Sequence, residues 1–137
     1  MTADIFFVNE IPFFISLSLN INFTVVRYLE KIKPIKIFKA FKEIYIYYLK
    51  RGFQITTLHV DGKFAPLKAL IQEIPGGPKV NLASDSEHVT DIERQIQLEK
   101  ESIRYIRHSL PLNKVPKIFL IHLVFQAIKM LNHFPLK

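Results

Sequence analysis

Three acidic residues of this 137-residue sequence could do chemistry through their carboxylates. Asp4 lies in an apolar amino-terminal segment, Asp61 directly follows an apolar run, and Glu93 lies in a later polar segment. Carboxylate oxygens are ligands that Mg²⁺ prefers. Two such ions, roughly 3.5–4 Å apart, stabilise the attacking and leaving oxygens of a phosphoryl displacement. The chain has no cysteine, which excludes a thiol nucleophile, a disulfide scaffold and cysteine-bound zinc.

Each acid also has an ordinary structural interpretation. Asp4 could be a solvated residue at the start of a strand, and Asp61-Gly62 is a common turn dipeptide. Glu93 could be one more solvated charge on a helix. The three carboxylates can act together only if the fold brings them together, so the elements that carry them decide between the interpretations.

The spacing of apolar residues predicts an α/β fold with a sheet of mixed direction. A short apolar segment at residues 3–8 and alternating apolar and polar residues at 11–19 and 23–28 predict an antiparallel meander of three strands. Pro34 then opens an amphipathic helix, and Gly52 follows it. The remaining pattern predicts strands at 53–60 and 79–83, and helices at 64–73, from a cap within 85–87 to about 108, and at 118–131. The order is βββ-α-β-α-β-α-α, in a single domain over residues 1–137.

This order could bring the three acids to one edge of the sheet. Asp4 lies on the first predicted strand, Asp61 at the carboxyl end of the fourth, and Glu93 on the third helix. Ligands of open α/β sheets collect at the carboxyl ends of the strands. His59 shares the strand face of Asp61. It could support the acids without binding the metals, but we expect it to be a packed strand histidine.

Charge points to a polyanionic partner or an anionic membrane surface. Lys and Arg number 19 against 12 Asp and Glu, which gives a net charge of +7. The two longest apolar runs, residues 11–26 and 118–128, are shorter than the roughly 20 residues that a bilayer span needs. We therefore expect no membrane insertion.

Several segments, in order along nearly the whole chain, resemble the integrase core of copia-type retrotransposons. They are Ala-Asp-Ile-Phe-Phe-Val-Asn-Glu-Ile-Pro-Phe-Phe at 3–14, Arg-Gly-Phe at 51–53, His-Val-Asp-Gly-Lys-Phe at 59–64, Glu-His-Val-Thr-Asp-Ile-Glu-Arg at 87–94, His-Ser-Leu-Pro at 108–111 and Asn-His-Phe-Pro at 132–135.

The resemblance implies a ribonuclease-H-like fold with a DDE catalytic triad of Asp4, Asp61 and Glu93. These acids would bind Mg²⁺, with two ions expected and Mn²⁺ as a substitute. Enzymes of this family trim the 3′ ends of the element's DNA and join them to target DNA. The implied partners are therefore DNA and further copies of the chain, and the implied location is the nucleus. We expect a fragment of a longer polyprotein, because the chain begins almost at the first catalytic strand and lacks the flanking zinc and DNA-binding regions of integrases.

Two departures from the family's pattern affect the site. The spacing from Asp61 to Glu93 is slightly short for the family, and Asp91 is an alternative third acid. Positions 91 and 93 point about 200° apart on a helix, so only one can face the metals. We prefer Glu93 because Arg94 follows it, as in the family's acid-Arg pair. Lys63 stands where the resemblance predicts another acid after Asp-Gly.

Basic residues beyond the third acid could bind DNA. If Glu93 faces the site, Lys100 and Arg104 lie on about the same helix face by their spacing. They could neutralise DNA phosphates beside the metals, and Lys63 and Arg107 are further candidates. The alternative is an ordinary solvated helix face.

Other hypotheses remain open. A non-catalytic integrase remnant would keep the fold and bind DNA or a partner without metal-dependent chemistry, and Lys63 favours this interpretation. A membrane-associated basic protein would depend on the two short apolar runs. The helix predicted at 118–131 either covers a face of the sheet or forms a subunit contact.

Overall fold

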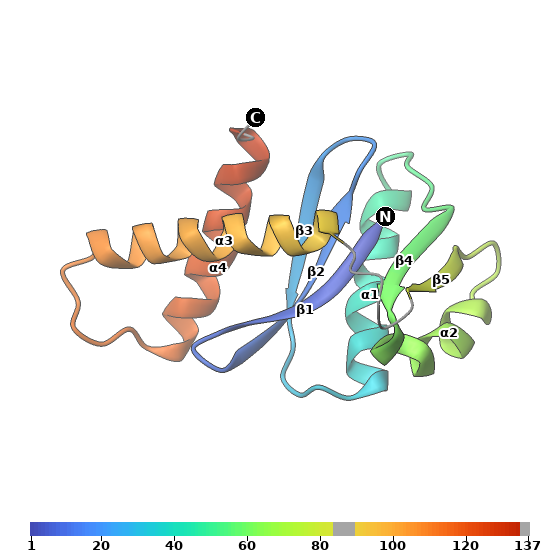
Figure 1. The fold of residues 1–137 in the computed structure, drawn as a ribbon, viewed down its shortest axis with the longest axis horizontal. Helices are drawn as coiled ribbons and strands as arrows, with labels where there is room; N and C mark the ends of the chain where they lie inside the picture. Colours follow the sequence, from blue (N-terminus) through green and yellow to red (C-terminus); the bar gives the residue numbers. More distant parts are fainter. Residues whose placement is uncertain (84–89, 135–137) are drawn as a thin grey trace.

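The computed structural model describes residues 1–83 and 90–134. Within these residues, one five-stranded sheet is covered by four α-helices and a short 3₁₀ helix (Figure 1). The elements are β1 (Thr2–Val8), β2 (Ile11–Ser18), β3 (Phe23–Tyr28), α1 (Pro34–Leu49), β4 (Thr57–Asp61), η1 (Gly62–Phe64), α2 (Ala65–Gln72), β5 (Lys79–Ala83), α3 (Thr90–Ser109) and α4 (Lys117–His133). The predicted mixed α/β fold is confirmed.

The sheet has the strand order β3-β2-β1-β4-β5. β1, β2 and β3 form the predicted antiparallel meander, and β4 and β5 are added to β1 in parallel. Asn9 and Glu10 make the two-residue turn between β1 and β2, and both have positive φ values, of 46° and 65°. This backbone is typical of the type I′ turn, whose twist matches that of a hairpin. The central position of β1 gives Asp4 neighbours on both sides.

Each face of the sheet has its own hydrophobic core. Side chains of the first core lie between the sheet and α1, η1 and α2: Ala3, Phe14, Val25, Leu58, Val60, Val80, Phe41, Ile44, Phe64, Leu67 and Ile71. Side chains of the second core lie between the sheet and α3 and α4: Phe6, Phe13, Ile15, Leu17, Val26, Ile92, Ile96, Ile103, Leu120, Val124 and Ala127. Helix α4 therefore covers a face of the sheet, which is one of the two roles predicted for it.

Two predicted boundaries were wrong for local reasons. The strand predicted at 53–60 begins only at Thr57. The backbone N–H of Gly52, at φ 78°, donates to Leu49, and the N–H of Phe53 donates to Tyr48. These hydrogen bonds cap the carboxyl end of α1, so the chain becomes extended only several residues later. The helix predicted at 64–73 begins at Ala65, after η1, and the cap predicted within 85–87 lies outside the described residues.

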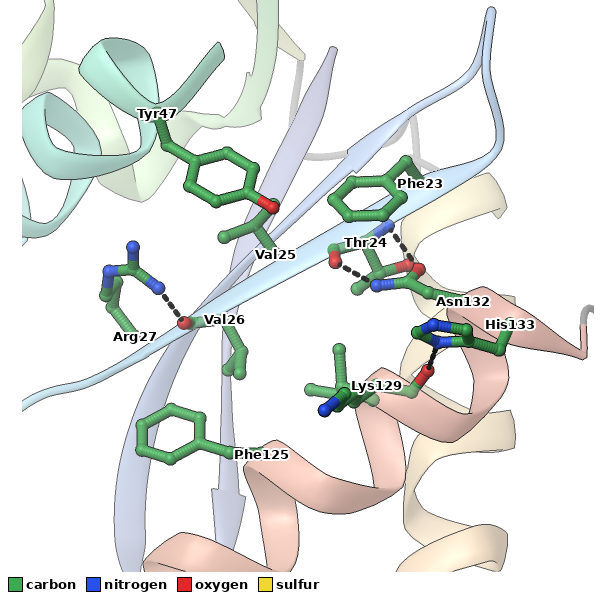
Figure 2. A pocket seen from close by; sticks show the side chains of 11 residues that line it. Phe23, Thr24, Val25, Val26, Arg27, Tyr47, Phe125, Lys129, Asn132 and His133 are labelled. Atoms are coloured by element: carbon green, nitrogen blue, oxygen red, sulfur yellow. Dashed lines mark hydrogen bonds between the residues drawn. The ribbon is translucent and has the colours of Figure 1, made fainter. Parts of the chain in front are cut away.

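The Asn132 side chain bonds the backbone at one residue of the edge strand β3. β3 is an edge strand, and the amide of Asn132 in α4 lies against the backbone of Thr24 (Figure 2). The Asn132 amide nitrogen donates to the carbonyl of Thr24 at 2.7 Å, and the Thr24 N–H donates to the amide oxygen at 2.9 Å. The amide thus replaces a neighbouring strand and satisfies groups that an edge leaves open.

The longer of the two apolar runs is part of the sheet. Residues 11–26 form β2 and the first residues of β3. In the part of the chain that the structure describes, no helix has the length and apolarity needed to cross a bilayer.

Candidate active site

The strand register brings Asp4 and Asp61 side by side. Thr2 of β1 pairs with His59 of β4 in a parallel ladder, so the residues two positions further along are Asp4 and Asp61. Both point to the face under α3 and α4. Asp4 lies opposite Ile15, whose side chain belongs to that core, whereas Asp61 alternates with Val60, which faces the other core.

The ammonium group of Lys63 lies between the two carboxylates. Its Nζ is 2.7 Å from Oδ1 of Asp4 and 3.7 Å from Oδ2 of Asp61. The two carboxylate oxygens are therefore no farther apart than the sum of these distances. That sum lies within the roughly 4–8 Å over which carboxyl groups share a metal pair. The structure thus brings together three of the residues selected from the sequence.

Backbone hydrogen bonds fix both carboxylates. Oδ1 of Asp4 accepts from the N–H of Ile5 at 2.7 Å, and Oδ1 of Asp61 accepts from the N–H of Gly62 at 2.6 Å. The second bond caps η1, so the turn that follows β4 depends on the Asp61 side chain. The side chain of Asp4 is only 19% exposed, whereas those of Asp61 and Lys63 are 46% and 51% exposed. The pair therefore faces solvent on one side.

The proposed third acid lies on α3, the helix that packs against β1. Glu93 and Asp91 are both in the first turn of α3, and both are exposed. Ile92 between them is buried in the core that includes Phe6 of β1. Helix α3 contacts β1, and in Figure 1 its first turn ends near the start of that strand. The choice between Glu93 and Asp91 stays a prediction.

The two aspartates have the chemistry of a divalent-cation site. Carboxylate oxygens suit Mg²⁺, and the Lys63 ammonium shows that a cation fits between them. Among residues 1–83 and 90–134, no group of three or more His, Asp or Glu side chains is arranged to hold a metal ion. Asp4 and Asp61 therefore fit a metal as two ligands.

Three of the four predicted DNA-binding residues lie on α3, and Lys63 lies in η1. Lys100 is half-buried and Arg104 is exposed on this continuous helix. The guanidinium of Arg107 donates to the side-chain oxygen of Asn9 at 3.3 Å, at the turn between β1 and β2. That turn is at the opposite end of β1 from Asp4, so Arg107 lies far along the sheet from the carboxylates.

One prediction about the strand face was wrong, and one buried residue was missed. His59 was expected to be packed, but it is exposed. Glu99 of α3 is completely buried, and one of its carboxylate oxygens, Oε2, has no hydrogen-bond partner. Burial raises the pKa of Glu99 to about 7, against the smaller opposing effect of its hydrogen bond from Gln95. The signal was present in the sequence, since Glu99 follows Ile92 and Ile96 at the spacing of one helix face.

A pocket of about 330 Å³ lies away from the acids. It opens between β3 and α4, beside the Asn132 side chain and the rings of Phe23 and Phe125 (Figure 2). β2 separates β3 from β1 in the sheet, so this pocket is not part of the carboxylate site.

Comparison with known proteins gives a structural likeness without a sequence match. No protein-family model and no curated protein matches the chain. Among solved structures, the HTLV-2 integrase catalytic core domain in complex with magnesium, in its trimeric form, superposes with a TM-score of 0.71. The match covers 99% of this chain and 86% of that chain, at 12% sequence identity. The chain therefore has the fold of an integrase catalytic core.

Proposed function

We propose that this chain is the catalytic core of a DDE polynucleotidyl transferase, from the integrase of a copia-type retrotransposon. It would act in 3′-end processing and DNA strand transfer. The nucleus is the expected location, because the target DNA lies there. The observation that carries the proposal is the placement of Asp4 and Asp61 on adjacent parallel strands, facing one cation, in an integrase-core fold.

We propose separate roles for the residues of the site. Asp4 and Asp61 would hold Mg²⁺, or Mn²⁺ in its place, with Glu93 or Asp91 as the third ligand from α3. The bound ions, two in number by resemblance, would supply Lewis-acid stabilisation of the attacking and leaving oxygens. The hydrogen bonds from Ile5 and Gly62 would hold the two aspartates in place before the substrate arrives.

Lys100 and Arg104 are the proposed contacts to the DNA backbone. On α3 they lie about 10 and 16 Å beyond Glu93 along the helix axis, at a rise of about 1.5 Å per residue. Phosphates at that distance would belong to nucleotides beyond the scissile bond. Contacts of this kind set affinity and position without reading bases. Because the matched HTLV-2 core is described as trimeric, self-association of this chain is part of the proposal.

The test is Mg²⁺-dependent nicking or joining of a DNA substrate by the wild type and by Asp61→Asn. Asparagine keeps an oxygen that can accept from Gly62, so the turn is retained while the charge is lost. We expect at least about a hundredfold loss of rate, because a metal ligand is removed. Glu73→Gln, at the end of α2, is the matched control. Equal rates for Asp61→Asn and the wild type would refute the site assignment.

The same assay identifies the third acid. Glu93→Gln is expected to abolish the reaction, whereas Asp91→Asn is expected to leave it unchanged. The reverse result would assign the role to Asp91. Loss in neither variant would show that the third ligand lies elsewhere.

A non-catalytic, DNA-binding remnant is the second candidate, favoured by the ion pairs of Lys63 with both acids. It predicts DNA binding that weakens between about 50 and 200 mM salt, with no metal-dependent strand chemistry. Replacing Arg104 by Gln should make the affinity for DNA less dependent on salt, by the amount expected for the loss of about one phosphate contact. Lys39→Gln, on α1 over the other face of the sheet, is the control. Salt-independent binding would argue against phosphate contacts.

A further inference from the structure

Lys63 is held beside the two aspartates by the local fold. η1 begins directly after Asp61, whose carboxylate caps it, and Lys63 is the middle residue of this short helix. Phe64, the next residue, is buried in the core under α1 and α2 and anchors the turn. Nζ of Lys63 also lies over the Phe64 ring, 5.4 Å from the ring centroid. The local fold therefore keeps the ammonium group close to both carboxylates.

The ammonium contacts the same oxygens that a metal would use. Its 2.7 Å contact to Asp4 is as short as charge-assisted hydrogen bonds become. A divalent ion bound to these oxygens would lie roughly 2.0–2.1 Å from them. An ammonium and a divalent ion so close together would repel strongly. The two cations cannot occupy the site at once.

The ammonium is also free to leave the site. Half of the Lys63 side chain is exposed, and its four-carbon stem can carry the charge into solvent. A tethered group of this kind acts at an effective concentration of about millimolar or higher. A divalent ion must therefore compete with a cation that is always present.

We infer that Lys63 is an internal competitor for the divalent-cation site of Asp4 and Asp61. It neutralises one of the two negative charges and keeps the carboxylates together when no metal is bound. A divalent ion binds only after the ammonium has moved away. This inference rests on the proposed metal site and adds to it a residue that weakens metal binding.

The test measures Mn²⁺ binding by the whole chain, without DNA or turnover. Wild type, Lys63→Gln and Lys79→Gln are titrated with Mn²⁺, and free Mn²⁺ is followed by electron paramagnetic resonance. Lys79→Gln removes the same charge at the start of β5, which pairs with Thr57 at the opposite end of β4 from Asp61. We expect Lys63→Gln to bind Mn²⁺ about tenfold more tightly or better, and Lys79→Gln to bind like the wild type.

A second variant assigns the binding to the acids. Adding Asp61→Asn to Lys63→Gln should remove the gain in affinity. Equal affinity in wild type and Lys63→Gln would overturn the competition and leave the proposed function standing. Absence of Mn²⁺ binding in every variant would overturn both, provided that circular dichroism shows each variant folded. If Lys79→Gln gains as much affinity for Mn²⁺ as Lys63→Gln, the gain comes from the change in net charge. That result also overturns the inference.

Discussion

Glu99 makes the stability of this protein depend on pH in a defined direction. Its side chain is completely buried in α3, and only one carboxylate oxygen has a partner, the Gln95 amide nitrogen at 2.7 Å. Burial raises the pKa of Glu99 to about 7, from an ordinary value of 4.5. The folded protein therefore holds a proton that the unfolded chain releases at lower pH. The free energy of unfolding should fall as pH rises from about 4.5 to just above 7.

The size of this effect follows from the two pKa values. One pKa unit corresponds to about 1.4 kcal/mol. The pKa difference between an ordinary glutamate and Glu99 therefore lowers the free energy of unfolding by about 3 kcal/mol at pH 8. Replacing Glu99 by Gln keeps an acceptor for Gln95 and removes the ionisation. We expect the variant to match the wild type near pH 4.5 and to be about 3 kcal/mol more stable at pH 8.

Urea denaturation at pH 4.5, 6 and 8 measures this difference. Glu101→Gln is the matched control, because Glu101 lies on the same helix but is exposed. It should show the pH dependence of the wild type. If Glu99→Gln loses as much stability between pH 4.5 and 8 as the wild type does, the pKa of Glu99 is not raised in the folded protein and the reasoning is wrong.

Two further predictions concern the backbone of the edge strand β3 and of the turn between β1 and β2. Asn132→Ala removes both hydrogen bonds to Thr24 and should lower the free energy of unfolding by about 2 kcal/mol, measured in urea; a loss below about 0.5 kcal/mol would mean that water replaces the amide fully. Glu10→Gly places glycine at a φ of 65° in the β1–β2 turn and should raise the free energy of unfolding by about 1 kcal/mol. The same change at Val8, in a strand, should destabilise, and a stabilisation there would contradict the turn argument.

The sheet was predictable because its strands carry strong local patterns. Alternation between Ile15, Leu17 and the polar residues around them identified β2, and the Asn-Glu break identified the turn before it. Antiparallel neighbours joined by short turns leave little choice of pairing. The addition of β4 and β5 in parallel follows from the helices that connect them.

The candidate site was predictable only in part. Asp4 and Asp61 could be selected because carboxylates at the start of one strand and the end of another can meet at a sheet edge. The third acid could not be chosen, since Asp91 and Glu93 are both exposed in the first turn of α3. Lys63 was a further candidate for a DNA contact, whereas the structure joins it to both aspartates.

Residue type and spacing within one element were enough to predict most strands and helices and to select the acids that could serve as metal ligands. Tertiary structure decided which charges meet. The register of Thr2 with His59 aligns Asp4 with Asp61, and the turn after β4 directs Lys63 between them. Burial of a charge is decided in the same way, by packing between elements distant in sequence. Energies of charges vary steeply with distance and solvent, so residues that look alike in the sequence acquire different roles in the fold.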